Sequence, residues 1–407
     1  MSIPTPKVEI GFDLTDSPIG PFFRLDDDVA GRLDNTDYRL GGKIFYDVTD
    51  RVRTITWSRG KSRRFANFQA GSLSVEFNNH DRAFDPLYVD SPFYGNIIPR
   101  REIRVTSGAA IQFTGWIDDW GLTYTPDGNS LADAIASDAF TIIANQTISA
   151  ETPIVQTTGE RIDAILSSPG VAWSNELRSI ETGEKNVGTQ EIADNTNALN
   201  YMQKVTETEA GLFFVGKNGA ITFRDGTQTA TSLDLVTFDQ QGGISYNNIG
   251  IVYGAELLYN EVTIANVGGG TATARDTASQ GEYGIRSLTI TDLLGATDEQ
   301  SIELAIKYAD LYSAPEYRIE QLEVGLHDLD PADQETVLNI ELGSICKVVF
   351  TPNGIGDPIE KFIQVIRMNH NVRPESHFVT FGFQEIKYLA LVLDDAVFGK
   401  LDVGTLG

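Results

Sequence analysis

The sequence predicts a multidomain, β-rich protein in which two β-rich blocks flank two α+β blocks. The chain has 407 residues, and at about 100–200 residues per domain this length corresponds to two to four domains. Near both ends, apolar and polar residues alternate over short stretches, as in strands with one buried face. Helix start and stop signals lie mostly between these regions. We expect domains at residues 1–128, 129–238, 239–325 and 326–407, the last with an extended C-terminal tail.

The first block is expected to form antiparallel strands. Apolar and polar residues alternate in KVEIGFDL and in GSLSVEF. Further along lies the aromatic stretch QFTGWIDDWGLTY, followed by a Pro-Asp-Gly turn signal. Trp116 and Trp120 are four residues apart in this stretch, so a regular strand would place both on one side. They could be core or subunit-contact residues, or a platform on which a sugar stacks.

The second block carries helix signals followed by a hairpin. Asp138 and the serine before it can cap a short helix, and Thr157 and Glu160 have the spacing of a capping box. A third helix is expected to begin near Asn197. GLFFV and AITFRD then flank a Gly-Lys-Asn-Gly turn. Asn-Gly is typical of tight hairpins in which both central residues have positive φ.

The third block combines strands with one long helix, and the fourth is again rich in strands. Thr297 and Gln300 frame the start of the long helix. Its apolar face is expected to consist of Ile302, Ala305, Ile306 and Ala309. The fourth block begins with a turn or helix at Asp330-Pro331. Its strands ICKVVF, KFIQVIRMNHNV and HFVTFGFQE predict a barrel or sandwich that ends in a long hairpin.

Two internal likenesses connect the ends of the chain. LDDDVAGRLD at residues 25–34 matches LDDAVFGKLD at residues 393–402 in seven of ten positions. In addition, the first and last blocks share an order of strands: REIRV corresponds to SICKVV, and FTGWIDDW to FIQVIRMN. The second likeness rests on pattern rather than identity. Together they indicate two related β-rich modules in one chain.

The composition excludes several classes of partner. The net charge is −26, which argues against a nucleic-acid-binding surface because phosphate contacts need an excess of Lys and Arg. The same charge argues against docking on anionic lipid. No stretch approaches the ~18 consecutive apolar residues of a membrane span, and the N-terminus has no pattern of a secretory signal. We expect synthesis in a host cytoplasm and no stable membrane association. Cys346 is the single cysteine, and its strand-like setting favours a buried hydrophobic role.

The motifs point away from an enzyme. The acidic clusters DDD, DD, DLDPAD and DD lack the spacing of a calcium loop, so caps and solvated turns are the better interpretation. The four histidines do not have the spacing of a zinc site. Nucleophile-elbow, phosphate-binding and dinucleotide motifs are absent. We therefore expect no catalytic, cofactor or metal site, although a pair of glycosidase carboxylates is defined by distance and stays open.

Several phrases resemble one family. FYDVTDRVRTITWSRGKSRRFANFQAGSLSVEFNNHDRAFDPLY at residues 45–88 is similar to minor tail proteins of long-tailed phages (siphoviruses) that infect actinobacteria. SPFYGNIIPRREIRV, QFTGWIDDW, SDAFTIIANQ, GLFFVGKNGAITFRD and the ending LDDAVFGKLD fit the same family. The resemblance covers essentially the whole chain in order, and its motifs are structural rather than catalytic.

The resemblance implies a tail-tip or baseplate hub, similar to the central hub protein of contractile-tailed phages. That fold has two β-barrel-like domains and two inserted α+β domains, and it assembles as a homotrimer. Such a protein would lie at the tail tip of the virion, close the distal end of the tail tube, adapt sixfold to threefold symmetry and open for DNA ejection. The implied partners are the distal tail protein or last tube ring, the tape-measure protein, other tail-tip proteins or fibres, and DNA only in transit.

The repeated decapeptides are the candidate subunit-contact residues. In this hypothesis their leucines fill apolar grooves, their glycines allow a turn, and their aspartates cap or pair with Arg. These residues are Leu25, Asp26, Asp27, Val29, Gly31, Leu33, Asp34, Leu393, Asp394, Asp395, Val397, Gly399, Leu401 and Asp402. The alternative is that each copy is a surface turn with no present role. Two rival functions are a hexameric distal tail protein and a cell-wall protein that binds or cleaves glycans.

Overall fold

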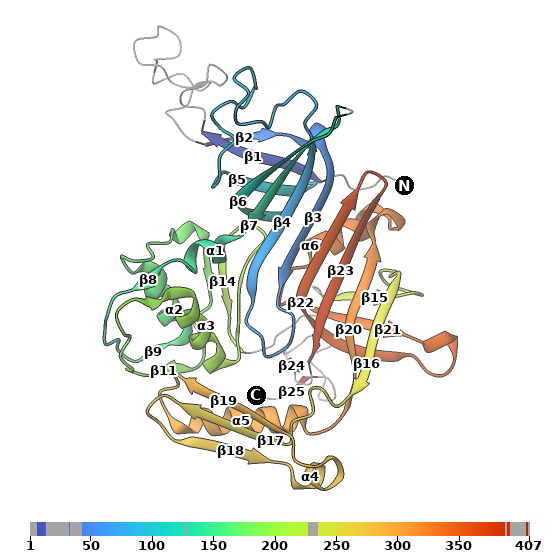
Figure 1. Ribbon diagram of the computed structural model, residues 1–407. Helices are drawn as coiled ribbons and strands as arrows, with labels where there is room; N and C mark the ends of the chain where they lie inside the picture. The colour runs from blue at the N-terminus through green and yellow to red at the C-terminus, as the bar shows by residue number, and fades with distance from the viewer. Residues whose placement is uncertain are drawn as a thin grey trace.

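The computed structural model describes residues 6–13, 32, 43–126, 128–226 and 235–386, and the short strands at 389–390 and 404–405. Within this part, thirteen strands form one large sheet that runs through the molecule, and the helices are few (Figure 1). The protein is therefore β-rich, as the sequence predicted, but its two β-rich blocks share one sheet, which the sequence did not predict.

The N-terminal β-block is built from strands with one buried face. In β4, Leu73, Val75 and Phe77 are buried while the residues between them are exposed or half-buried, which is the period of two that alternation predicts. The strands of this block are β1 (Lys7–Asp13), β2 (Lys43–Asp47), β3 (Val52–Gly60), β4 (Gln69–Asn78), β5 (Glu102–Ser107), β6 (Ala110–Tyr124) and β7 (Ser130–Ser137).

The C-terminal β-block is assembled from two separate stretches of chain. Two of its strands precede the second α+β block and four follow it. They are β15 (Val236–Asp239), β16 (Asn248–Gly254), β20 (Glu316–Gly325), β21 (Ile345–Phe350), β22 (Ile359–Arg373) and β23 (Ser376–Glu385). Helix α6 (Pro331–Asn339) starts at Asp330 with Pro331 in its first turn, and β22–β23 form the long hairpin, both as predicted.

The two β-blocks have the same strand order. The strands lie in the order β3-β4-β7-β6-β5 in one block and β16-β20-β23-β22-β21 in the other, each neighbour antiparallel. The fourth strand along the chain, β6 or β22, has 15 residues in both blocks and carries a bulge near its middle. Beyond these five strands the blocks differ, because β1 pairs with β5 antiparallel whereas β15 pairs with β21 parallel. The predicted correspondence of REIRV with SICKVV and of FTGWIDDW with FIQVIRMN is confirmed, whereas the order of the remaining strands across the sheet was not predicted.

The first α+β block lies between β7 and β15. Its helices begin at the predicted caps: the Asp138 side chain accepts a hydrogen bond from Phe140, Thr157 and Glu160 form a capping box, and Asn197 caps the third helix. The elements are α1 (Ala139–Ile143), β8 (Thr147–Ile148), β9 (Gln156–Thr157), α2 (Thr158–Ser167), β10 (Arg178–Ile180), β11 (Asn186–Val187), β12 (Thr196–Asn197), α3 (Ala198–Glu209), β13 (Leu212–Val215) and β14 (Ile221–Arg224).

The hairpin turn between β13 and β14 differs from the prediction. Of its residues 216–219, Gly219 alone has a positive φ, +82°. Gly219 N–H donates to the Gly216 carbonyl, and Gly216 N–H donates to the Ala220 carbonyl. The loop is thus one residue longer than a two-residue turn, and Asn218 keeps an ordinary φ while its side chain accepts from Ala220 N–H.

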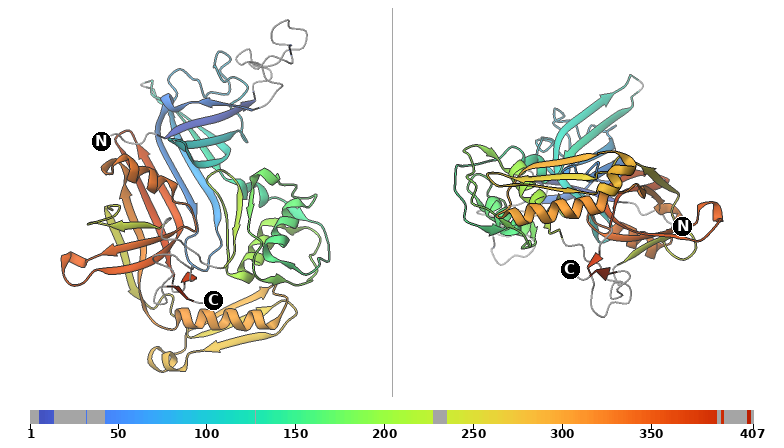
Figure 2. Two further views of the ribbon diagram at one scale, coloured as in Figure 1. Left: turned by 180° about the vertical axis from the view of Figure 1, so that it is seen from behind. Right: turned by 90° about the horizontal axis from the view of Figure 1, so that it is seen from below.

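The second α+β block is inserted between β16 and β20. A three-stranded sheet, β17 (Glu261–Asn266), β18 (Thr271–Arg275) and β19 (Ser287–Leu293), packs against α5 (Asp298–Tyr312), while α4 (Thr277–Tyr283) lies at its end (Figure 2). The capping box of Thr297 and Gln300 is confirmed.

The predicted apolar face of α5 is half wrong. Ala305 and Ala309 are buried, but Ile302 and Ile306 are 48% and 57% exposed. The reason is that α5 packs its Tyr308 and Tyr312 side of the helix on the sheet of β17 and β18. Phe65 on the β3–β4 loop adds to this core, with its ring 5.5 Å from Tyr308 and 5.3 Å from Tyr312. The buried face therefore follows these tyrosines, which an aliphatic pattern leaves out.

Strand pairing regroups the chain relative to the predicted blocks. β7 lies beyond residue 128 but joins the N-terminal sheet, and β16 and β20 lie within 239–325 but pair with each other in the C-terminal β-block. The partners are far apart in sequence, so alternation alone does not place them. The division into four domains stays a prediction.

Candidate functional site at the seam between the β-blocks

Strand β22 joins the two β-blocks by changing its partner half-way along one edge. Residues 359–364 of β22 pair with β21, and residues 367–372 pair with β3 of the N-terminal β-block. The bulge between Val365 and Arg367 separates the two halves. We call the β3–β22 pairing the seam. It converts two sheets into one through backbone hydrogen bonds, which hold the blocks in a fixed orientation.

Gly60 ends β3 at the point where β22 changes partner. Its φ is +126°, a conformation that side chains with a Cβ rarely adopt. A Cβ at this position would lie 2.2 Å from the Ile366 carbonyl oxygen. Lys61 N–H donates to the same oxygen at 2.9 Å. The close approach of the two strands therefore requires glycine at position 60.

Three histidines meet beside the seam, two on the β22–β23 hairpin and His327 fifty residues before His377. The His370 ring stacks on Trp57 with a centroid distance of 4.1 Å, and its Nδ1 lies 3.1 Å from Nε2 of His377. Nδ1 of His327 lies 3.4 Å from the His377 backbone. The short turn of the β22–β23 hairpin brings His370 and His377 to one face. The hairpin register is the signal that could have revealed this pair.

Neutral imidazole is the form that this site favours. Burial lowers the pKa of His370 well below its ordinary value, and the neighbouring His377, Lys217 and Arg59 lower it further. Between the folded and unfolded pKa values, the unfolded chain binds more protons than the folded chain. Burying His370 therefore costs no stability above about pH 6.5, the pKa of the unfolded chain. Below that pH the free energy of unfolding decreases as the pH falls.

Replacing His370 should remove this pH dependence. Between pH 7.5 and pH 5.5, we expect the free energy of unfolding of wild type to fall by about 1.4 kcal/mol relative to that of the His370→Gln variant. The reason is that one buried histidine stays unprotonated in the folded chain. Urea unfolding at both pH values measures the difference. The exposed His80 provides the control, since His80→Gln should follow wild type. Parallel pH profiles for wild type and His370→Gln would contradict this assignment.

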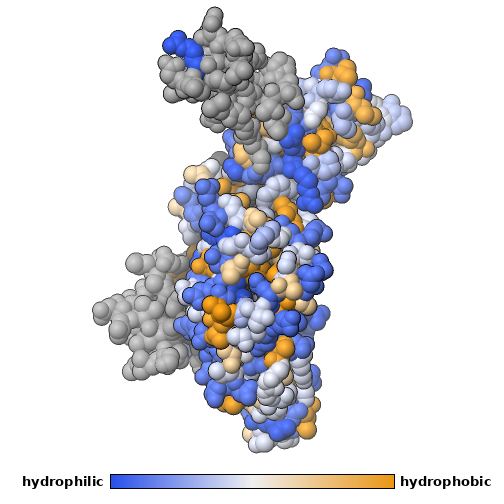
Figure 3. All heavy atoms as spheres, turned by 90° about the vertical axis from the view of Figure 1, so that its left-hand side faces the viewer, coloured by the Kyte–Doolittle hydropathy of each residue, from blue (hydrophilic) through white to orange (hydrophobic). Residues whose placement is uncertain are grey.

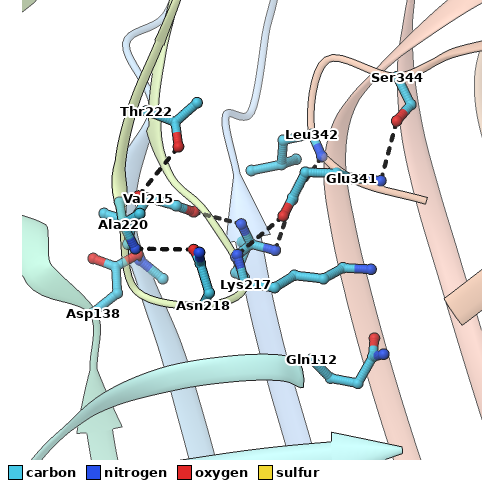
Figure 4. Close-up of polar contacts among 12 residues, drawn as sticks. Gln112, Asp138, Val215, Lys217, Asn218, Ala220, Thr222, Glu341, Leu342 and Ser344 are labelled. Atoms are coloured by element: carbon cyan, nitrogen blue, oxygen red, sulfur yellow. Dashed lines mark hydrogen bonds and ion pairs between the residues drawn. The ribbon is translucent and has the colours of Figure 1, made fainter. Parts of the chain in front are cut away.

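An ion pair between buried Arg59 and half-buried Glu341 holds the first α+β block against the seam. Arg59 of β3 is 3% exposed, and its Nη1 lies 2.9 Å from Oε1 of Glu341, which follows α6. Arg59 Nη2 also donates to the Val215 carbonyl on the β13–β14 hairpin. Lys217 N–H, in the hairpin turn, donates to Glu341 Oε2 at 3.0 Å. Figure 4 shows the Glu341 side chain pointing toward the β13–β14 hairpin from the segment that follows α6.

Further contacts tie the hairpin, the start of α1 and both β-blocks to one another. Lys217 Nζ and Gln112 Nε2 both donate to the Leu338 carbonyl, at 2.5 Å and 3.1 Å. Asp138 accepts from Gly71 N–H at 2.6 Å, which ties the start of α1 to β4. We call Arg59, Glu341, Lys217 and these neighbours the three-block junction. Three parts of the chain meet there, so it fixes their relative positions.

The charges at the junction are adjusted by burial. Burial alone would raise the pKa of Glu341, but Arg59 and Lys217 attract its charge and hold the pKa below its ordinary value. Burial lowers the pKa of Lys217 to about 8 despite Glu341. Burial also raises the pKa of Asp138 to about 7, against its backbone hydrogen bonds and Arg59. The junction thus depends on the mutual pairing of its charges.

The predicted interface residues cannot be placed. Both decapeptides, with all fourteen candidate contact residues from Leu25 to Asp34 and from Leu393 to Asp402, lie outside the described residues. Their role stays a prediction. The acidic clusters DDD at 26–28 and DD at 394–395 also lie outside the described residues.

Of the remaining acidic clusters, DLDPAD caps a helix as predicted, whereas Asp118 and Asp119 lie within strand β6 and form neither a cap nor a turn. Asp118 accepts from Ser137 Oγ and lies 3.5 Å from Arg100 Nη1. Asp330 caps α6 by accepting from two backbone N–H groups. Cys346 is buried, and burial raises the pKa of its thiol to about 12. Among the described residues, no three His, Cys, Asp or Glu side chains converge as metal ligands.

Trp116 and Trp120 do not form a common surface. The bulge in β6 falls between them, at Asp118, and shifts the alternation by one residue. Trp116 consequently packs against Trp173 of the first α+β block, at 6.2 Å, whereas Trp120 stacks on Phe84 inside the N-terminal β-block, at 5.7 Å. The prediction that both lie on one side is wrong, and the sugar platform loses its basis.

Two solved structures of phage tail proteins share this fold. A 43 kDa tail protein of prophage MuSo2 from Shewanella oneidensis aligns over 84% of this chain and 96% of its own, with a TM-score of 0.53 and 14% identity. A tail protein from Neisseria meningitidis MC58 aligns over 84% of this chain and 94% of its own, with a TM-score of 0.58 and 11% identity. No protein-family model and no curated protein matches the sequence.

The shared fold extends over most of both chains. At these identities the likeness concerns architecture and not individual residues. As to membranes, none of the helices in the described part of the chain is long and apolar enough to span one.

Proposed function

We propose that this chain is a structural protein of a phage tail, a homotrimeric hub at the tail tip. It would close the distal end of the tail tube, adapt sixfold to threefold symmetry and open for DNA ejection. The observation that carries the proposal is the repeated strand order of the two β-blocks, joined by the seam. Three chains with two such modules each would offer six similar modules to a tube with six subunits per ring.

The edges of the sheet supply the contact that such a ring needs. The seam joins β3, the first strand of one module, to the second half of β22 in the other. In the other module of each, β16 corresponds to β3 and β6 corresponds to β22, and neither β16 nor β6 takes part in the seam. Among the described strands, β16 pairs only with β20, and β6 beyond Ile117 pairs only with β7. We infer that β16 of one copy pairs with the second half of β6 of the next copy, which repeats the seam between chains and closes a ring.

Equivalent positions set the register of this contact. In the seam, Ile55 lies opposite Val372, six residues after the bulge residue Ile366. Tyr124 likewise lies six residues after the bulge residue Asp118. Ile249 pairs with Leu322, and Ile55 pairs with Val75. Because Leu322 and Val75 occupy equivalent positions in the two modules, Ile249 of β16 is equivalent to Ile55 of β3.

The expected neighbours across the contact are apolar. Ile249 would face Tyr124 of the next copy, and Ile251 would face its Leu122. Tyr124 is 52% exposed in the single chain, and Tyr253 at the end of β16 is 69% exposed. Pairing two edges would bury such side chains, which is a favourable use of cross-strand aromatic residues.

The charge of the chain fits a channel through which DNA slides. A net charge of −26 would repel phosphate rather than bind it. The face in Figure 3 is largely hydrophilic, with small separate hydrophobic spots. The expected neighbours are the distal tail protein or last tube ring, the tape-measure protein and other tail-tip proteins or fibres. The sequence resemblance favours a siphovirus of actinobacteria as the source.

Cysteine cross-linking tests the register. We expect the Ile249→Cys/Tyr124→Cys variant to form disulfides between chains, because directly opposed residues in paired strands have the spacing that a disulfide needs. The control pairs Ile249→Cys with Thr123→Cys, which points to the other face of β6. Gel mobility should show linked dimers and trimers in the first variant alone. Equal cross-linking in both variants, or none in either, would contradict the contact.

The mass of the assembly separates the hub from its main rival. Light scattering on the purified chain should give three copies, whereas a distal tail protein would give six. The same measurement on a chain truncated before residue 393 tests the decapeptides: if they make subunit contacts, the truncated chain stays folded but forms fewer trimers.

A further inference from the structure

A cavity of about 240 Å³ lies at the root of the second α+β block. The chain leaves the C-terminal β-block at Gly254 and returns at Glu316, and these two residues pair at the end of β16 and β20. The β3–β4 loop, β20, the bulge of β22 and the end of β23 form the walls of the cavity. The cavity therefore touches both connections of the inserted block and both β-blocks.

Cationic side chains outnumber carboxylates in the lining. The cations are Lys61, Arg63, Arg64, Arg318 and Arg367. The carboxylates are Glu256, Glu316, Glu320 and Glu385. This excess is local, because the chain as a whole carries a net charge of −26.

Two of the arginines present nitrogen atoms that lack acceptors. Arg318 is 9% exposed, and its buried Nη2 has no hydrogen-bond acceptor within the described part of the chain. Its nearest carboxylate oxygen, from Glu320, is 3.9 Å away. Arg367 Nε is buried and lacks an acceptor among the described residues too. Gly382 leaves room for the Arg367 side chain, since a Cβ there would lie 3.0 Å from Nε.

The other charged groups are already engaged or partly neutral. Arg64 Nη1 donates to the Glu385 carbonyl at 2.7 Å, and Lys61 Nζ donates to the Arg64 carbonyl at 2.8 Å. Burial raises the pKa of the Glu385 carboxyl to about 7 and lowers the pKa of Lys61 to about 7, so both groups are partly neutral at neutral pH. Buried cations without full compensation are costly, and an added anion would relieve that cost.

We propose that this cavity binds a carboxylate group, held by the guanidinium groups of Arg318 and Arg367. A guanidinium group donates two parallel hydrogen bonds to a carboxylate, which makes arginine the side chain best suited to this ligand. The volume admits a small organic anion or one acidic side chain, since a water molecule occupies about 30 Å³. A bound carboxylate would contact both connections of the inserted block and so hold that block against the sheet.

Calorimetric titration of the full chain tests the proposal. The probes are citrate and a capped Asp-Asp-Asp peptide, with sodium chloride at matched ionic strength and a capped Asn-Asn-Asn peptide as controls. We expect saturable binding of citrate, of the Asp peptide, or of both, and the pattern tells whether the carboxylate comes from a free anion or from an acidic segment. Arg318→Gln and Arg367→Gln should each weaken binding about tenfold, as loss of a charged hydrogen bond predicts.

The matched control is Arg53→Gln on the same strand that leads into the β3–β4 loop. Arg53 has a side chain that is 52% exposed, so the variant should bind as wild type does. If Arg318→Gln does not fold, the less buried Arg367 decides the outcome. Wild type that binds neither probe, or Arg367→Gln that binds both with wild-type affinity, would overturn the proposal. The site does not depend on the tail role, so either can fail alone.

Discussion

The Gly60→Ala variant should be the most damaging single methyl addition in the seam. We expect it to lower the free energy of unfolding by at least about 3 kcal/mol, because the positive φ is strained for alanine and the strands must separate as well. The added Cβ would lie 2.2 Å from the Ile366 carbonyl oxygen and 2.6 Å from Arg367 Cα. Both are backbone atoms of β22, so no side-chain rotation can make room.

Urea unfolding measures this loss as a shift of the midpoint at constant slope. Gly108 is the matched control, because it also has a positive φ, +59°, but nothing lies within 4 Å of its Cβ position. Gly108→Ala should therefore cost only about 1 kcal/mol, the strain of the backbone alone. Equal losses in the two variants would mean that the seam does not restrict position 60.

The second large effect is expected at the three-block junction. Glu341→Gln should lower the free energy of unfolding by about 3 kcal/mol, because it leaves the Arg59 charge buried without its counter-ion. Arg59 is 3% exposed and has few other acceptors, the Val215 carbonyl among them. The Arg59→Met/Glu341→Gln double variant should recover much of the loss, since it removes the unpaired charge together with its partner.

A double-mutant cycle measures this coupling. The control is the exposed pair of Arg53 and Glu76, whose Nε–Oε1 distance is 3.5 Å and whose side chains are 52% and 33% exposed. Their coupling should stay under about 1 kcal/mol, as for other surface ion pairs. A coupling between Arg59 and Glu341 as small as that would contradict the role of the junction in fixing the three parts of the chain.

Local signals in the sequence predicted local structure well. The capping boxes at Thr157 and Thr297 and the Asp-Pro start at residue 330 are all present. Such signals act over three or four residues, so the sequence contains the whole interaction. The alternation in β4 and β23 is local in the same sense, and it predicted strands in both β-rich blocks but not their pairing partners.

What the sequence could not show depends on contacts between distant segments. The bulge at Asp118 sends Trp116 and Trp120 to different cores. Packing on β17 and β18, with Phe65 beside them, turns the buried face of α5 away from Ile302 and Ile306. The seam pairs Gly60 with Arg367, some three hundred residues later. A positive φ and a close backbone approach leave no sign in the sequence except glycine itself, which also occurs in ordinary turns.

Imaging of virions that contain this chain tests the central claim most directly. Electron cryomicroscopy of the tails should locate three copies at the distal end of the tube. Their six β-blocks should form one ring, with β16 of each copy beside β6 of the next. A ring of six chains that each contribute one β-block, or copies that lie away from the tube axis, would contradict the account.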